Sequence, residues 1–168
     1  LAAMKELNYH PSHAARMLAG RKTDTIGVVL PVIDNGYYVQ VLHGIDSAMM
    51  KSKLKLLISF YHSVSELSEI LSTLCGEGRT DAIILSNNTK LQPGDVRKLA
   101  GNNIPIVLIG QNHGNTKAID SVLAQNYHGG YAAVKHLLIN KPKSLLLITG
   151  HKHNYDSQAR LKGDRQAI

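Results

Sequence analysis

The chain has 168 residues, of which 43% are hydrophobic and 18% charged, and this apolar content excludes a mostly disordered chain. No apolar run approaches the roughly 20 residues that a membrane-spanning helix needs, so we expect a soluble protein with no membrane partner. The 19 Lys and Arg residues outnumber the 12 Asp and Glu residues to give a net charge of +7, which suits a polyanionic partner without requiring one.

The cysteine content and the start of the chain both indicate a reducing compartment. Cys75 is the single cysteine, which excludes an internal disulfide framework and a cysteine-cage zinc site. The first residues lack the long apolar core of a secretion signal. We therefore expect a cytoplasmic location.

The first 24 residues predict two short helices. Leu1, Met4 and Leu7 follow helical spacing up to Pro11, which disfavours helical geometry in the residue before it. A second helix is predicted from about His13 to Ala19, and its roughly seven residues fall well below the 12–15 at which isolated helices become marginal. We expect this second helix to order only when something packs on it.

Short apolar runs predict the strands of a parallel sheet. Runs that are almost continuous in Ile, Val and Leu are typical of strands buried on both faces. Those runs are Ile26–Leu30, Leu54–Ile58, Ala82–Leu85, Ile104–Ile109 and Leu145–Ile148. The short piece Ser121–Leu123 predicts a further strand, where the chain leaves one lobe for another.

Segments with helical spacing separate these runs. Their apolar stripes are Val39, Leu42, Ile45 and Met49; then Val64, Leu67, Leu71 and Leu74; then Tyr131, Val134 and Leu138. Ser63 and Glu66 predict a capping box at the start of the second helix, and Gly76 predicts its end. Alternation of strands and helices predicts an α/β fold with a doubly wound parallel sheet. A new helix starts shortly before Ile168, so we expect a fragment in which a second lobe is only begun.

Motifs for catalysis and cofactor binding are weak throughout the chain. The turn after the first predicted strand, Pro31–Gly36, is neither a dinucleotide fingerprint nor a phosphate loop, and no G-x-S-x-G elbow is present. His151 and His153, with Asp156, could hold a metal, but a polar loop explains them better because two ligands do not make a site. The sequence predicts no enzyme, no cofactor, no catalytic residue and no metal site.

Polar and aromatic side chains cluster after the predicted strands, where ligands bind in open α/β sheets. Tyrosines, amides, carboxylates and an arginine suit a polyhydroxy ligand, although loops are also polar without any ligand. The candidates are Asp34, Asn35, Tyr37, Tyr38, Gln125, Asn126, Asn154, Asp156 and Arg160.

Several segments, in order, resemble the lactose/galactose-repressor (LacI/GalR) family. Residues 7–20 resemble the end of the DNA-binding headpiece and the hinge helix, and residues 25–31 resemble the first core strand. Further matches are Asn35–Tyr38 with Gly44-Ile45, Asp81–Leu85, Ile104–Val107, Asn126–Gly130, and Ser157 with Arg160-Leu161 and Gly163. Gln125, where members often carry Asp, and Gly36, where proline is common, depart from the family pattern.

The resemblance implies a cytoplasmic transcriptional regulator, in particular a repressor, that binds operator DNA as a homodimer. Its core would be like the type I periplasmic binding proteins, preceded by a short hinge helix, with a sugar or sugar phosphate held between two lobes. The implied segments are a headpiece end (1–10), a hinge helix and linker (11–24), an N-terminal effector lobe (25–123) and the start of a C-terminal lobe (124–168). The resemblance also suggests that the helix around Val39 to Ser52 and the strand after it form part of the dimer contact.

The resemblance implies which residues contact the effector and which contact the DNA. The implied effector contacts are Asp34, Tyr37, Tyr38, Gln125, Asn126, Asn154, Asp156 and Arg160, with Asn154 and Asp156 in the loop before the arginine. The implied DNA contacts are Ser12, Ala15, Arg16, Leu18 and Ala19, with Leu18 as the side chain that wedges between base pairs of the minor groove. Two alternatives stay open: a periplasmic-type sugar-binding module without DNA binding, and an α/β enzyme.

Overall fold

The computed structural model describes residues 22–32, 36–86, 93–101, 104–110, 119–152 and 154–168. The predicted hinge helix, the headpiece end and Asp34 therefore lie outside the described residues. By their internal contacts the residues divide into two compact units, Leu1–Ile84 with Lys98–Pro105, and Leu85–Arg97 with Ile106–Ile168. None of the described helices is long and apolar enough to cross a membrane.

Five strands form one parallel sheet in the order β2-β1-β3-β4-β5. The strands are β1 (Thr25–Pro31), β2 (Lys55–Tyr61), β3 (Ala82–Ser86), β4 (Ile106–Ile109) and β5 (Asp120–Val122). The helices between and after them are α3 (Gly36–Ser52), α4 (Val64–Gly76), α5 (Pro93–Ala100), α6 (Asn126–Leu138) and α7 (Tyr155–Ala167). This strand order is one of the doubly wound arrangements, so the predicted fold class is confirmed.

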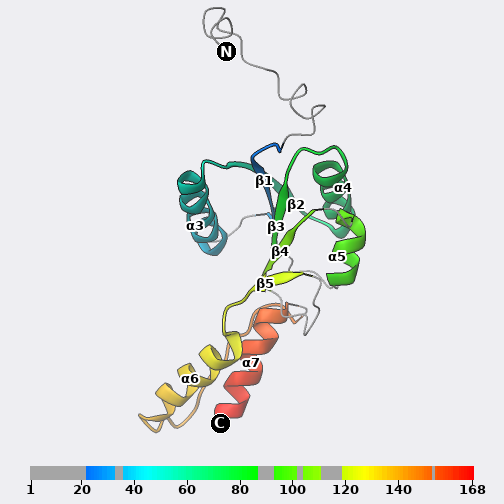
Figure 1. Ribbon diagram of the computed structural model, residues 1–168. Helices are drawn as coiled ribbons and strands as arrows, with labels where there is room; N and C mark the ends of the chain where they lie inside the picture. Colours follow the sequence, from blue (N-terminus) through cyan, green and yellow to red (C-terminus); the bar gives the residue numbers. More distant parts are fainter. Residues whose placement is uncertain (1–21, 33–35, 87–92, 102–103, 111–118, 153) are drawn as a thin grey trace, which may run out of the picture. The chain divides into compact units, whose positions relative to one another are not determined.

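The first unit is built on the parallel pair β1 and β2, which runs in register from Thr25 beside Lys55 to Pro31 beside Tyr61. Val28, Val29 and Leu30 are completely buried, as the continuous apolar run predicts. Figure 1 shows α3 and α4 on opposite sides of these strands.

Helix α4 has the predicted boundaries and the predicted buried face. The Ser63 side chain accepts a hydrogen bond from the Glu66 N–H (3.2 Å), and the Glu66 carboxylate accepts one from the His62 N–H (2.8 Å). The reciprocal bond of the predicted capping box therefore reaches one residue further back than Ser63. The buried residues of α4 are Leu67, Leu71 and Leu74.

Helix α3 differs, because none of its residues is buried. Val39 is 40% exposed and Met50 is 75% exposed. Ile58 and Phe60 on β2, the strand at the end of the sheet order, are 42% and 44% exposed. The helix was predicted correctly, but its apolar stripe covers less core than the spacing suggests.

The start of β1 is fixed by the carboxylate of Asp81. This carboxylate accepts hydrogen bonds from the backbone N–H groups of Thr23 (2.9 Å) and Asp24 (2.8 Å). The Asp81 N–H donates in turn to the carbonyl of Thr25 (2.8 Å), and the Lys55 N–H donates to the carbonyl of Asp24 (2.8 Å). Asp24 has a φ of 52°, so the chain turns sharply as it enters the sheet.

In the second unit, β4 and β5 pair in parallel from Val107 beside Asp120 to Ile109 beside Val122. The predicted run Ile104–Ile109 becomes a strand only from Ile106, because Pro105 has no N–H to give to a ladder. The predicted short strand Ser121–Leu123 is present as β5, shifted by one residue towards the N-terminus.

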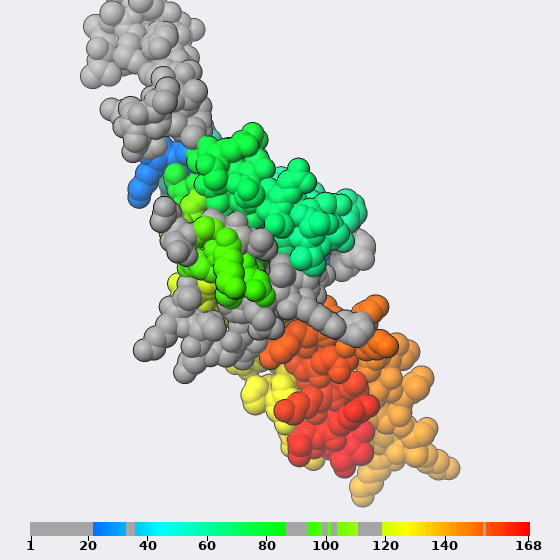
Figure 2. Space-filling model, turned by 90° about the vertical axis from the view of Figure 1, so that its right-hand side faces the viewer, coloured from blue at the N-terminus to red at the C-terminus, as the bar shows by residue number. Residues whose placement is uncertain are grey.

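Helices α6 and α7 lie side by side in both views (Figures 1 and 2). Gly130 permits this approach: a Cβ there would lie 2.5 Å from the Arg160 carbonyl oxygen. A Cβ at Gly163 on α7 would come still closer to the Tyr127 carbonyl oxygen. The two glycines therefore let the backbones of the two helices touch.

One predicted strand is absent and one helix was not predicted. Leu145–Ile148 is not a strand: these residues have no regular structure, and Leu146 and Ile148 are 83% and 90% exposed. An apolar run becomes a strand only when a neighbour accepts its backbone hydrogen bonds, and no described segment pairs with this one. Helix α5 was not predicted, because its short sequence has few apolar residues to reveal a period.

Candidate effector-binding site

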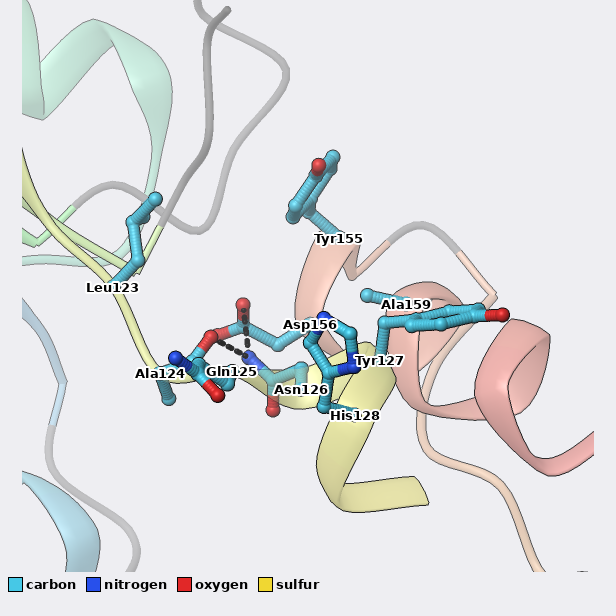
Figure 3. A pocket seen from close by; sticks show the side chains of 9 residues that line it. All are labelled: Leu123, Ala124, Gln125, Asn126, Tyr127, His128, Tyr155, Asp156 and Ala159. Atoms are coloured by element: carbon cyan, nitrogen blue, oxygen red, sulfur yellow. Dashed lines mark hydrogen bonds between the residues drawn. The ribbon is translucent and has the colours of Figure 1, made fainter. Parts of the chain in front are cut away.

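A pocket of about 230 Å³ lies in the second unit, where β5 runs into α6 and where α7 begins. Its lining comes from the connection after β5 and from the first residues of both helices (Figure 3). The lining residues are Leu123, Ala124, Gln125, Asn126, Tyr127, His128, Tyr155, Asp156 and Ala159. This is the position where ligands bind in open α/β sheets, beyond the carboxyl ends of the strands.

The start of α6 presents two amide side chains to this pocket. Gln125 occupies the N-cap position, and its carbonyl accepts the first helical bond from the Gly129 N–H (2.8 Å). Its side chain makes no capping bond, so the amide is not used to hold the helix end. Asn126 is the first residue of the helix proper.

Asn126 joins α6 to α7 through a polar network. Its Nδ2 donates to Oδ1 of Asp156 (2.8 Å), and Figure 3 shows the amide and the carboxylate facing each other. Its Oδ1 accepts from Nη1 of Arg160 (2.5 Å). The side-chain amide of Asn126 thus binds two other predicted effector residues, Asp156 and Arg160, which lie 30 and 34 positions further along the sequence.

Asn154 has a structural role at the start of α7. Its side-chain oxygen accepts a hydrogen bond from the Ser157 N–H (2.9 Å), as an N-cap does. Ser157 Oγ in turn accepts from Nη2 of Arg160 (3.4 Å). Asn154 therefore lies in the loop before α7, as expected, whereas the expected loop position of Asp156 was wrong, because Asp156 stands in the first turn of the helix.

The carboxylate of Asp156 is half-buried, and burial raises its pKa, against the opposing effect of the nearby Arg160 charge. A Cβ at Gly110, the residue after β4, would lie 3.6 Å from Oδ2 of Asp156, which is an ordinary contact distance. The raised pKa indicates an acceptor group that is partly withdrawn from bulk water.

Aromatic rings complete the lining, and the sequence reasoning did not name them as ligand contacts. The rings of Tyr127 and His128 meet edge to face, with centroids 5.3 Å apart. Tyr155 comes from the first residue of α7 and is 48% exposed. Tyr127 and Tyr155 directly follow the predicted contacts Asn126 and Asn154, and His128 comes one residue after Tyr127; this adjacency is the signal that could have found them.

The remaining predicted contacts are not part of this pocket. Tyr37 and Tyr38 lie in the first turn of α3, with ring centroids 5.1 Å apart and planes at 72°. Tyr37 is 51% exposed. Asp34 and all five predicted DNA contacts, Ser12, Ala15, Arg16, Leu18 and Ala19, lie outside the described residues.

The described residues give little support to a metal site or to a reactive cysteine. They contain no group of three or more His, Cys, Asp or Glu side chains that could hold a metal ion, and His153 is outside them. Cys75 is half-buried, and burial raises the pKa of its thiol, which is the opposite of what an activated nucleophile needs.

The groups that line the pocket can bind a polyhydroxy ligand. Amide and carboxylate oxygens accept hydrogen bonds from hydroxyl groups, amide nitrogens donate to them, and tyrosine faces cover the apolar side of a sugar ring.

Curated relatives of this chain include proteins named as transcriptional repressors. The HTH-type transcriptional repressor PurR of Vibrio parahaemolyticus is 26% identical over 168 residues, which cover 100% of this chain and 50% of that protein. The ribose operon repressor of Haemophilus influenzae is 27% identical over 164 residues, 97% of this chain and 48% of that protein. The chain thus spans about half the length of the curated relatives it matches.

The fold is shared with a repressor of known structure. A crystal structure of the Lac repressor dimer bound to operator and the anti-inducer ONPF has a TM-score of 0.80 at 23% identity, covering 99% of this chain and 50% of that chain. Residues 23–168 match the family described as periplasmic binding proteins and the sugar-binding domain of the LacI family. The resemblance found in the sequence is therefore confirmed, and the chain belongs to this family.

Proposed function

We propose that this chain is part of a DNA-binding transcriptional repressor whose affinity for its operator is set by a small polyhydroxy effector. One observation carries the proposal: a relative named as a transcriptional repressor aligns with all 168 residues, including the 22 that precede the family match. A binding module that only captures sugar has no need of that preceding segment. The proposal assigns no catalytic role to any residue and places the protein in the cytoplasm.

The effector site of this proposal is the polar pocket of the second unit. Asn126, Asp156 and Arg160 form its hydrogen-bonded centre, with Gln125 beside them. Asn154 supports the centre by capping α7. Asp34, Tyr37 and Tyr38 are proposed as the contacts contributed by the N-terminal lobe, residues 25–123.

DNA binding is proposed for the segment 11–24 together with the headpiece end, 1–10. Ser12, Ala15, Arg16 and Ala19 would position the hinge helix on the minor groove, with Leu18 as the wedge. Basic residues at 16, 21 and 22 add attraction that depends on salt rather than on sequence. A helix too short to hold itself can be ordered by DNA, which makes its order sensitive to effector binding.

The homodimer is proposed to form through the open face of α3 and β2. We define this open face by Val39 and Leu42 of α3 and Leu56 and Ile58 of β2, which line a hollow of about 320 Å³. Exposed apolar side chains that gather in one place mark interaction surfaces. A second copy is the proposed occupant, because the similar Lac repressor was crystallised as a dimer on its operator.

The test is selection of DNA by the intact protein from a pool of random duplexes, followed by fluorescence anisotropy with the selected duplex. A pseudo-palindromic sequence should be enriched, and its affinity should fall as salt rises. Leu18→Ala should weaken binding at least about tenfold, whereas Leu18→Met, which keeps an apolar wedge, should retain most of it. Enrichment of no sequence, or equal affinity of wild type and Leu18→Ala, would contradict the proposal.

A further inference from the structure

The chain enters the first strand, β1, through residues that several hydrogen bonds hold in place. The Thr23 side chain accepts from the Thr25 N–H (3.2 Å), and the Thr25 hydroxyl donates to the Thr23 carbonyl (3.1 Å). The carbonyl of the residue between them, Asp24, accepts from the Lys55 N–H on β2 (2.8 Å). Thr23 and Thr25 are each 8% exposed, so water competes little for the bonds between them.

Asp81, the residue before β3, holds the N–H groups of the same two residues. Its Oδ1 accepts from the Thr23 N–H and its Oδ2 from the Asp24 N–H, across 58 and 57 residues of sequence. Both oxygens of one carboxylate therefore bind two consecutive backbone donors, and bonds to an ionised acceptor are stronger than neutral ones. The Asp81 N–H donates to the Thr25 carbonyl, which fixes Asp81 itself beside β1. We call this carboxylate with its two N–H donors the Asp81 clamp.

The clamp acts on a turn that the backbone rarely adopts by itself. Asp24 has a φ of 52°, in the left-handed region, where a residue other than glycine persists only when its surroundings hold it. Residues 23 and 24 are also the last two of the segment for which DNA binding is proposed, residues 11–24. The held turn thus sets the direction in which that segment leaves the sheet.

We infer that Asp81 is a positioning residue for DNA binding, because its carboxylate fixes the turn through which the DNA-binding segment joins the core. The inference rests on the proposed function in taking residues 11–24 as that segment. In wild type, Thr23 and Asp24 are ordered when the core folds. Without the clamp they have to be ordered when DNA binds, and the entropy lost at that step weakens the complex in both protomers of the proposed dimer.

The test measures the affinity of intact Asp81→Asn for the selected duplex by fluorescence anisotropy. Asparagine keeps one acceptor oxygen and turns an NH₂ group towards the second N–H, so the clamp loses one of its bonds. The Kd of the selected duplex should rise at least about tenfold, and that of a random duplex should rise less than about twofold. Removal of a negative charge would by itself strengthen binding to DNA, so a weaker complex indicates an effect of position rather than of charge.

A matched variant and two measurements without DNA separate this role from a purely structural one. Glu69→Gln removes the same charge at an exposed position of α4 and leaves the clamp intact, so the selected duplex should bind no more weakly than to wild type. Amide hydrogen exchange at residues 23 and 24 should become at least about threefold faster in Asp81→Asn and stay unchanged in Glu69→Gln. The Kd of a sugar that binds wild type should be the same for both variants, which shows that the core remains folded.

The inference is overturned if Asp81→Asn binds the selected duplex as tightly as wild type does, or if amide exchange at residues 23 and 24 is unchanged. It is also overturned if sugar binding weakens as much as DNA binding, because the substitution would then act on the whole core. Failure of the proposed function has a different signature, since wild type itself would then select no duplex. An unchanged affinity in Asp81→Asn leaves the DNA binding of wild type, and with it the proposed function, intact.

Discussion

Helices α3 and α4 lie on opposite sides of the same two strands, yet they use their apolar residues differently (Figure 1). Leu67 and Leu71 of α4 are completely buried and Leu74 is 4% exposed. Helix α3 is longer, 17 residues against 13, and buries none. Apolar residues at helical spacing therefore predict a helix, but they do not show whether its apolar face is buried in the same chain.

The difference in burial between α3 and α4 indicates that the apolar face of α4 is used for folding, whereas the apolar face of α3 is available for association. Apolar burial is the main favourable term in both processes, so the same residue types serve either one. The closed face of α4 should govern the stability of the unit, and the open face of α3 and β2 should govern self-association.

The sharpest test of this comparison is one substitution on each helix. Leu71→Ala should destabilise the fold by about 2–5 kcal/mol, because it empties a completely buried site. Val39→Glu, at a site 40% exposed in the first turn of α3, should cost less than about 0.5 kcal/mol and should weaken the dimer at least about tenfold. Urea unfolding and sedimentation velocity measure the two effects.

The proposed difference between the two helices is contradicted if Val39→Glu lowers the free energy of unfolding as much as Leu71→Ala, or if Val39→Glu leaves the dimer affinity unchanged. A milder change at the same site, Val39→Ala, serves as a control for loss of area without added charge.

A second test uses glycines with and without close neighbours. Gly130→Ala should destabilise the protein by about 1–3 kcal/mol, because its Cβ would meet the backbone of α7. Gly129 on the same helix and Gly44 on α3 have nothing within 4 Å, so alanine at either site should stabilise by about 0.5–1 kcal/mol. Equal effects at positions 129 and 130 in thermal unfolding would contradict the close packing of α6 on α7.

The smallest effect concerns the start of β1, the strand that both helices flank. Burial acts to raise the pKa of Asp81, but the N–H donors of Thr23 and Asp24 and the charge of Lys22 outweigh it and lower the pKa. A lowered folded-state pKa means that the stabilisation is present above about pH 4 and is lost as the pH falls through the folded value.

Asp81→Asn should therefore cost about 0.5–1 kcal/mol at pH 6, because solvent screens this accessible carboxylate, and progressively less as the pH falls below 4. Urea unfolding across that range measures the difference, with Glu69→Gln at an exposed position of α4 as the control. A constant difference between wild type and Asp81→Asn from pH 6 to pH 3 would contradict this account.

Elements that bury apolar residues locally were readable from the sequence. β1 and α4 were predicted because their buried apolar residues follow a pattern that the sequence itself displays. Leu145–Ile148 is as apolar as the centre of β1 but no described segment pairs with it, and a strand depends on a partner that composition cannot reveal.

The residues of the candidate effector site could be predicted only in part, because some of them meet only through the packing of two helices. Polar residues after a strand indicated Gln125 and Asn126, since that rule is topological, whereas Asp156 was indicated by the run Leu145–Ile148, which is not a strand. The bonds of Asn126 to Asp156 and Arg160 depend on how α6 packs on α7, which no local period encodes. Even the first turn of α7, which holds Asp156, was read as a loop, because its apolar residues are few.

The central claim is that a sugar in the pocket changes the affinity for DNA. The most direct measurement is the affinity of the intact protein for its selected duplex, by anisotropy, with and without a saturating sugar that binds. The account predicts a change of about 5- to 150-fold, in either direction, at constant salt. An affinity that is identical with and without the bound sugar would contradict it.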